Sequence, residues 1–264
     1  MAILNDFYPM GLDNKSVPDS VVQQAPAVCL VCVVGQPFVT KTGLSPKTSG
    51  FYFKNQPLYP NAVSKSSLCA PWADEAAVWM VGTAFAVGVR RFISCWHVVE
   101  DVLNEIESSP KQLLLVSGYF RTPSSSKFKY TLLRVLRIER DGLDFCTITT
   151  DDSLPSGIRP FDFAKTAAKP GDDVWTVGHP LGQPLKYAEG TVASTSDDRF
   201  KAFITYFPGS SGSPVCLRKT GEVLGVLCSG TNLSDFARDK MQGCYTYAKF
   251  PNNDDSAATC LLRP

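Results

Sequence analysis

The sequence lacks several features that would assign it to a class at once. Its 26 basic and 25 acidic residues leave a formal net charge of +1, so we expect neither nucleic acid nor an anionic membrane as a partner. No apolar run approaches the roughly 18 residues that predict a membrane-spanning helix. The N-terminal segment has no basic start followed by an apolar block, which argues against a secretory signal peptide.

Cysteine is present in an odd number, nine, and most of these residues lie in apolar runs such as AVCLVCVV and GVLCSG. Because an unpaired cysteine behaves as a small buried hydrophobe, we expect reduced structural thiols in an intracellular, cytoplasmic protein. Cys29 and Cys32 have CxxC spacing, but no second pair or nearby histidine completes a zinc ligand set. We therefore expect no metal and no cofactor.

Short β-rich segments separated by turn residues make up most of the chain, which predicts an all-β fold. Only 98–106 favours a helix. Residues 151–170, rich in proline and aspartate, predict a linker between two β units, and 35–76 predict a long insertion, with one further short strand at 51–53. The expected strands are 78–89, 92–95, 112–117, 130–138, 143–149, 173–177, 187–194, 200–206, 223–229 and 244–250.

The hexapeptide GSSGSP, at 209–214, is the sharpest functional signal. A hydroxyl nucleophile needs an activating base and backbone N–H groups that stabilise the developing oxyanion. In this interpretation Ser211 is the nucleophile, and the N–H groups of Gly209 and Ser211 form the oxyanion hole. A polar turn between two strands remains the alternative, because Gly, Ser and Pro are the ordinary turn residues.

The base must come from one of only two histidines. His97, in FISCWHVVE, ends an apolar run and is the better candidate, whereas His179, in VGHPLG, is typical of a turn. The third member must orient the imidazole. Asp144, in GLDFCTI, lies in an expected strand, where an acid is costly unless it has a partner. Asp141 precedes a glycine and is typical of a hairpin turn, so Asp144 is the better candidate.

The order His97, Asp144, Ser211, with gaps of 47 and 67 residues, resembles that of the chymotrypsin-like clan of serine proteases. Within the clan, the chain is most similar to trypsin-like peptidase domains of the HtrA type and to viral chymotrypsin-like serine proteases. The resemblance covers about 78–250 and rests on GTAFAVGVRRFISCWHVV, LDFCTI, GSSGSP, DDVWTVGHPLG, GTVA, VLGVLCSG and GCYTYAKF.

The resemblance implies two antiparallel Greek-key β-barrels with the active site in the cleft between them. The first barrel, with the insertion near 35–76, carries His97 and Asp144, and the second carries Ser211 and the specificity pocket. The implied ranges are 1–26 for an N-terminal extension, 27–150 for the first barrel, 151–170 for the linker, 171–250 for the second barrel and 251–264 for a C-terminal tail.

The activity implied is that of a serine endopeptidase, which hydrolyses a protein or peptide substrate through an acyl-enzyme. A catalytically inactive binding or structural module with the same fold is the alternative. GSSGS also fits the GxSxG pattern of lipases, but the histidine precedes the serine here, contrary to their order. The resemblance places the substrate pocket, which would favour large apolar side chains, at Thr205, Tyr206, Cys228, Ser229, Gly230 and Gly243.

Overall fold

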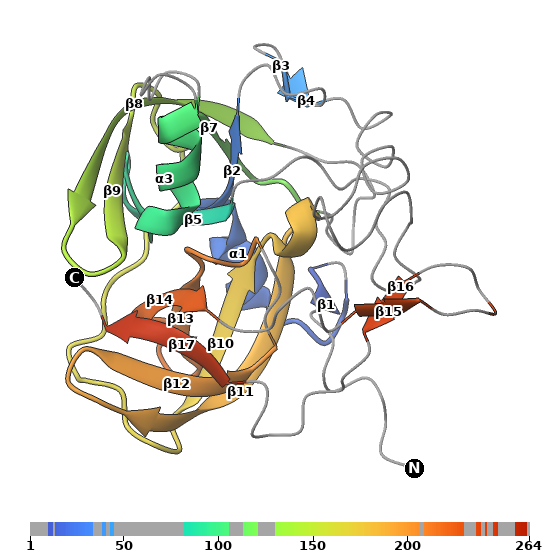
Figure 1. The fold of residues 1–264 in the computed structure, drawn as a ribbon, viewed down its shortest axis with the longest axis vertical. Helices are drawn as coiled ribbons and strands as arrows, with labels where there is room; N and C mark the ends of the chain where they lie inside the picture. The colour runs from blue at the N-terminus through green and yellow to red at the C-terminus, as the bar shows by residue number, and fades with distance from the viewer. Residues whose placement is uncertain are drawn as a thin grey trace.

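β-Strands that form two barrels dominate the computed structural model of the chain (Figure 1). This all-β, two-barrel architecture confirms the fold expected from the sequence. The structure describes residues 10–12, 14–33, 39–40, 43–44, 82–105, 113–120, 130–205, 209–229, 236–238, 241, 245–247 and 257–262.

The first barrel is closed by six strands in the order β2-β5-β6-β9-β8-β7. Side chains along β8 alternate between the barrel interior and the surface, as expected for a barrel wall. Leu133 and Val135 are buried, whereas Arg134 and Leu136 are exposed. The strands are β2 (Val28–Val33), β5 (Gly82–Gly88), β6 (Arg91–Cys95), β7 (Leu113–Ser117), β8 (Thr131–Asp141) and β9 (Phe145–Thr150).

The second sheet curls into a ring with the same connectivity as the first barrel. The opposite ends of β11 pair with β10 and β12, and β13, β14 and β17 complete the circuit. In both barrels the third strand pairs with the sixth, and the first with the fourth. The strands are β10 (Asp173–Gly178), β11 (Lys186–Thr195), β12 (Arg199–Ile204), β13 (Pro214–Leu217), β14 (Val223–Ser229) and β17 (Ala257–Leu262), with β1 (Met10–Gly11) added beside β11.

Short helices and two small sheets lie outside the barrels (Figure 1). No helix in the described part of the chain is long and apolar enough to cross a membrane. The helices are α1 (Asp19–Gln24), η2 (Ala25–Ala27), α3 (Trp96–Glu105) and η4 (Pro180–Gly182). The small sheets pair β3 (Val39–Thr40) with β4 (Gly43–Leu44), and β15 (Phe236–Arg238) with β16 (Tyr245–Tyr247).

The end of the chain differs from the expectation. Residues 257–262, assigned to a tail, form β17, which pairs with both β12 and β14 and so completes the second ring. Of the strand expected over 244–250, the described residues 245–247 form β16, which pairs with β15 outside the second ring. Six residues after a polar stretch give little local signal, and the two strand edges that β17 satisfies come from distant parts of the chain. The short strand expected at 51–53 lies outside the described residues.

The connection between the barrels is packed rather than loose. The amide of Phe161 donates to the Ala86 carbonyl of β5 at 2.8 Å. Its ring lies 5.7 Å from that of Phe85 in the first barrel and 6.3 Å from that of Trp175 in the second, centroid to centroid. Phe161 therefore links the two barrels, because its ring buries apolar surface against one ring from each of them.

Candidate active site

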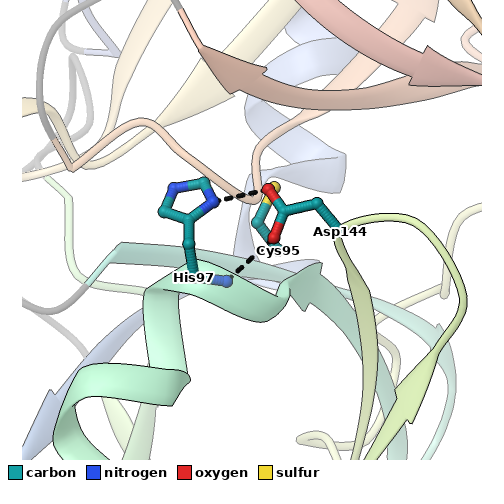
Figure 2. Close-up of side chains that lie close together, drawn as sticks. All are labelled: Cys95, His97 and Asp144. Atoms are coloured by element: carbon teal, nitrogen blue, oxygen red, sulfur yellow. Dashed lines mark hydrogen bonds and ion pairs between the residues drawn. The ribbon is translucent and has the colours of Figure 1, made fainter.

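His97 and Asp144 form a hydrogen-bonded pair at one rim of the first barrel (Figure 2). His97 is the second residue of α3, directly after β6, and Asp144 directly precedes β9. The imidazole Nδ1 lies 2.6 Å from Asp144 Oδ2, and the His97 amide donates to Oδ1 at 2.9 Å. The Trp96 amide also donates to the Asp144 carbonyl at 2.8 Å. Three contacts thus fix the imidazole relative to the carboxylate.

The hairpin between β8 and β9 presents Asp144 to the histidine. Gly142 and Leu143 both have positive φ, at 37° and 36°, as in the two-residue turns that match the twist of a hairpin. Asp144 therefore lies at the end of the turn and not within the strand expected over 143–149. Leu143 is the one non-glycine residue with positive φ in the described part of the chain, so this turn carries backbone strain beside the site.

The surroundings of Asp144 favour its ionised form. Burial alone would raise the pKa of this carboxyl group, but the side-chain and backbone hydrogen bonds from His97, aided by the charges of His97 and Arg199, lower the pKa below its ordinary value. An ionised carboxylate accepts the proton on Nδ1, so the neutral imidazole has its lone pair on Nε2. His97 is thereby prepared to accept a proton at Nε2.

Cys95, His97 and Asp144 form the one group of metal-ligating side chains within the described residues, with ligand atoms within 4.8 Å of one another. The donor set does not fit a metal ion. The 2.6 Å contact occupies His97 Nδ1 and Asp144 Oδ2 with each other. Burial raises the pKa of the Cys95 thiol well above its ordinary value, and its Sγ lies 3.4 Å from the Leu227 carbonyl as a donor. A protonated thiol is a poor metal ligand.

Ser211 lies in a tight loop before β13, and its neighbours fix the direction of its peptide groups. The Ser210 carbonyl accepts hydrogen bonds from the Ser213 amide at 3.0 Å and the Ser213 hydroxyl at 2.6 Å. Because C=O and N–H point in opposite directions in a trans peptide, the Ser211 N–H points away from Ser213. Gly209 and Gly212 adopt φ of +93° and +88°, a conformation that glycine adopts without strain.

The loop is seated on β5, close to the start of α3. The Thr83 amide donates to the Ser211 carbonyl at 2.9 Å. A Cβ at Gly82 would lie 2.6 Å from the Val98 side chain and 3.1 Å from the Ser211 carbonyl oxygen. Glycine at this position therefore lets the Ser211 backbone approach the residue that follows His97. Segments far apart in the sequence meet here, and β5 of the first barrel contacts the serine loop of the second.

A family model for the trypsin-like peptidase domain matches residues 82–226, more than half of the chain. The chain belongs to this family. A crystal structure of an inactive serine-to-alanine mutant of Rv3671c from M. tuberculosis is similar in fold, with a TM-score of 0.53 and 15% identity over 92% of this chain and 83% of that chain. No curated protein matches the sequence.

The residues expected to form the substrate pocket of this peptidase domain are only partly described. Cys228 and Ser229 end β14, where Cys228 is buried and Ser229 exposed, and Thr205 is half-buried directly after β12. Tyr206, Gly230 and Gly243 lie outside the described residues. The pocket therefore stays a prediction.

His179 lies outside the His97–Asp144 pair and is wholly buried at the start of η4. Its Nδ1 lies 2.9 Å from the Gln183 carbonyl, which requires a proton on Nδ1. Burial lowers its pKa to about 4. Sequence reasoning placed His179 in a turn, which is where it lies, but its complete burial and its amide contact with Thr83 gave no signal in the sequence.

Proposed function

We propose that the protein is a serine endopeptidase in which Ser211 is the nucleophile, His97 the general base and Asp144 the residue that orients it. The short His97–Asp144 contact is the observation that carries the proposal, because it assigns the Nδ1 proton and leaves Nε2 to act as a base. The trypsin-like peptidase family and the direction of the Ser211 N–H support the same interpretation.

The proposed reaction has two halves. Ser211 Oγ attacks the scissile carbonyl carbon as its proton passes to His97 Nε2, and the resulting oxyanion accepts hydrogen bonds from the N–H groups of Gly209 and Ser211. The C–N bond then breaks, the leaving amine takes the proton from His97, and an acyl ester remains on Ser211. Water repeats the sequence on the ester and releases the acid, and the serine proton is restored.

A fluorophosphonate probe tests the nucleophile, because it labels only an activated serine hydroxyl. We expect rapid labelling of the wild type and none of Ser211→Ala, together with a loss of peptidase turnover of about 10⁴-fold or more. Ser210→Ala is the matched control, since it removes the neighbouring hydroxyl but keeps the Ser210 carbonyl that binds Ser213. Equal labelling of Ser211→Ala and the wild type would reject the assignment.

The alternative is an inactive module that binds peptides. A wild-type protein that is folded, binds peptides and resists the probe would favour that function. The intact set of His97, Asp144 and Ser211, with the two first-barrel members already hydrogen-bonded, supports the enzyme instead.

A further inference from the structure

Thr83, a wholly buried residue of β5, contacts the serine loop with both its backbone and its side chain. Its amide donates to the Ser211 carbonyl at 2.9 Å, and its hydroxyl donates to the Gly209 carbonyl at 2.7 Å. The two carbonyls flank the peptide whose N–H is proposed to form half of the oxyanion hole. One residue of the first barrel therefore contacts both ends of that peptide from a position 126 residues away in sequence from Gly209.

The direction of the Thr83 hydroxyl proton follows from its neighbours. The His179 amide approaches the same oxygen at 3.1 Å, and an amide can only donate. The hydroxyl oxygen accepts from His179, so its single proton points to the Gly209 carbonyl. This arrangement needs a hydroxyl, because the side chain accepts from one turn of the second barrel and donates to another.

The Thr83 backbone is itself held from the opposite side. Ser94 Oγ of β6 donates to the Thr83 carbonyl at 2.7 Å. A Cβ at Gly212 would lie only 1.9 Å from that carbonyl oxygen and 2.5 Å from Ser94 Oγ. Thr83 therefore has little room to shift. Its contacts with the serine loop hold that loop in one place relative to β5.

The carbonyls of Gly209, Ser210 and Ser211 all accept hydrogen bonds from within the protein. The donors belong to Thr83 and Ser213. In each trans peptide the following N–H points away from its carbonyl. If the Gly209 carbonyl lost its partner, the loop could turn about Gly209, which as a glycine has wide conformational freedom. The Ser211 N–H and Oγ would then leave their places together.

From these contacts we propose that Thr83 is a positioning residue of the active site, whose hydroxyl locks the Gly209 carbonyl and so preorganises the oxyanion hole. This inference rests on the proposed role of Ser211. Thr83 does not touch the reacting atoms, and it acts through the peptide groups of Gly209 and Ser211. Preorganised donors act on the charge that develops in the transition state, so their loss lowers kcat more than it raises KM.

Thr83→Val tests the hydroxyl, since valine keeps the β-branched shape and the amide that binds the Ser211 carbonyl. We expect kcat for a peptide substrate to fall about 10- to 100-fold, with KM changed less than about threefold. Thr83→Ser keeps a hydroxyl and should restore kcat to within about threefold of the wild type. Each rate is divided by the concentration of active sites, titrated with the fluorophosphonate probe, so that unfolded protein does not count.

Thr176→Val is the matched control, because Thr176 is also buried and its hydroxyl donates to the Pro214 carbonyl of β13 at 2.8 Å. It should lower the melting temperature without changing kcat per active site.

Thr83→Ala replaces the valine variant if the latter does not fold, and it should show the same loss of kcat. If the Thr83 variants kept the wild-type kcat while Ser211→Ala was inert, the role proposed for Thr83 would be wrong and the proposed function would stand. A fully active Ser211→Ala would overturn the proposed function, and this inference with it.

Discussion

The two histidines of the chain lie in opposite environments. His97 has a side chain that is 44% exposed and a carboxylate partner on Nδ1, whereas His179 is wholly buried with a main-chain carbonyl on Nδ1. A carboxylate stabilises the charged imidazolium that forms when Nε2 accepts a proton. A carbonyl in an apolar setting orients the ring but does not offset the cost of a buried charge.

The hydrogen-bond partner and the exposure of each imidazole ring decide its chemistry. Both rings have the proton on Nδ1, so the tautomer alone does not distinguish a base from a structural residue. His97 lies at the rim of the barrel with its ring partly exposed, while His179 packs against Tyr119 with ring centroids 6.2 Å apart, and burial lowers the pKa of His179 to about 4.

Replacement of the two histidines should give the largest contrast. His97→Ala removes the proposed base, and we expect turnover to fall about 10⁴-fold or more, as for Ser211→Ala. His179→Gln keeps a donor for the Gln183 carbonyl and leaves its own amide on Thr83, so turnover should stay within about fivefold. Steady-state kinetics on folded protein measure both. An inert but folded His179→Gln beside an active His97→Ala would reverse the two roles.

Loss of the Asp144 carboxylate should leave His97, like His179, without a negatively charged partner on Nδ1. Asp144→Asn removes the charge that stabilises imidazolium and favours the wrong tautomer, so kcat should fall by about 10³- to 10⁴-fold with the fold intact.

Asp141→Asn is the matched control for Asp144→Asn on the same hairpin. The Asp141 carboxylate accepts from the Thr147 hydroxyl and does not contact His97, so the change should alter kcat less than about threefold. If Asp141→Asn were the damaging change, the roles assigned within this hairpin would be wrong.

The smallest expected effect is the contribution of His179 to the pH dependence of the free energy of unfolding. The pKa of His179 falls from 6.5 to about 4 on folding, so between these values the unfolded chain binds more protons than the folded one. Its contribution to stability is complete above pH 6.5 and is lost as the pH falls toward 4, by about 3 kcal/mol in all. Below pH 4 this loss levels off.

Urea unfolding of the wild type and His179→Gln between pH 7 and 4 measures this loss. The glutamine side chain does not titrate, so the difference in unfolding free energy between the two proteins should shrink as the pH falls. A difference that stays constant over this range would show that His179 is protonated without cost in the folded protein.

Much of the site could be inferred from single segments. The GSSGSP motif and the Asp-Gly pair before Asp144 each occupy a few consecutive residues, and the chain has only two histidines from which to choose the candidate base. The short β-rich segments indicated the all-β fold. The strand register around Asp144 was less accurate, because a turn with two positive φ angles places it before β9 and not inside it. The role of 257–262 was missed, since its partners lie in β12 and β14.

The sequence by itself determined the strand pattern and the order of the candidate residues, because side-chain periodicity, turn residues and motifs are local properties of the chain. Only the tertiary structure decided that Asp144 binds His97, that His179 is buried, and that Thr83 reaches the Gly209 and Ser211 carbonyls. These contacts join residues that are 47 to 128 positions apart in the sequence. Hydrogen bonds between such distant groups form only once the strands that carry them have assembled into the barrels, so no local pattern records them.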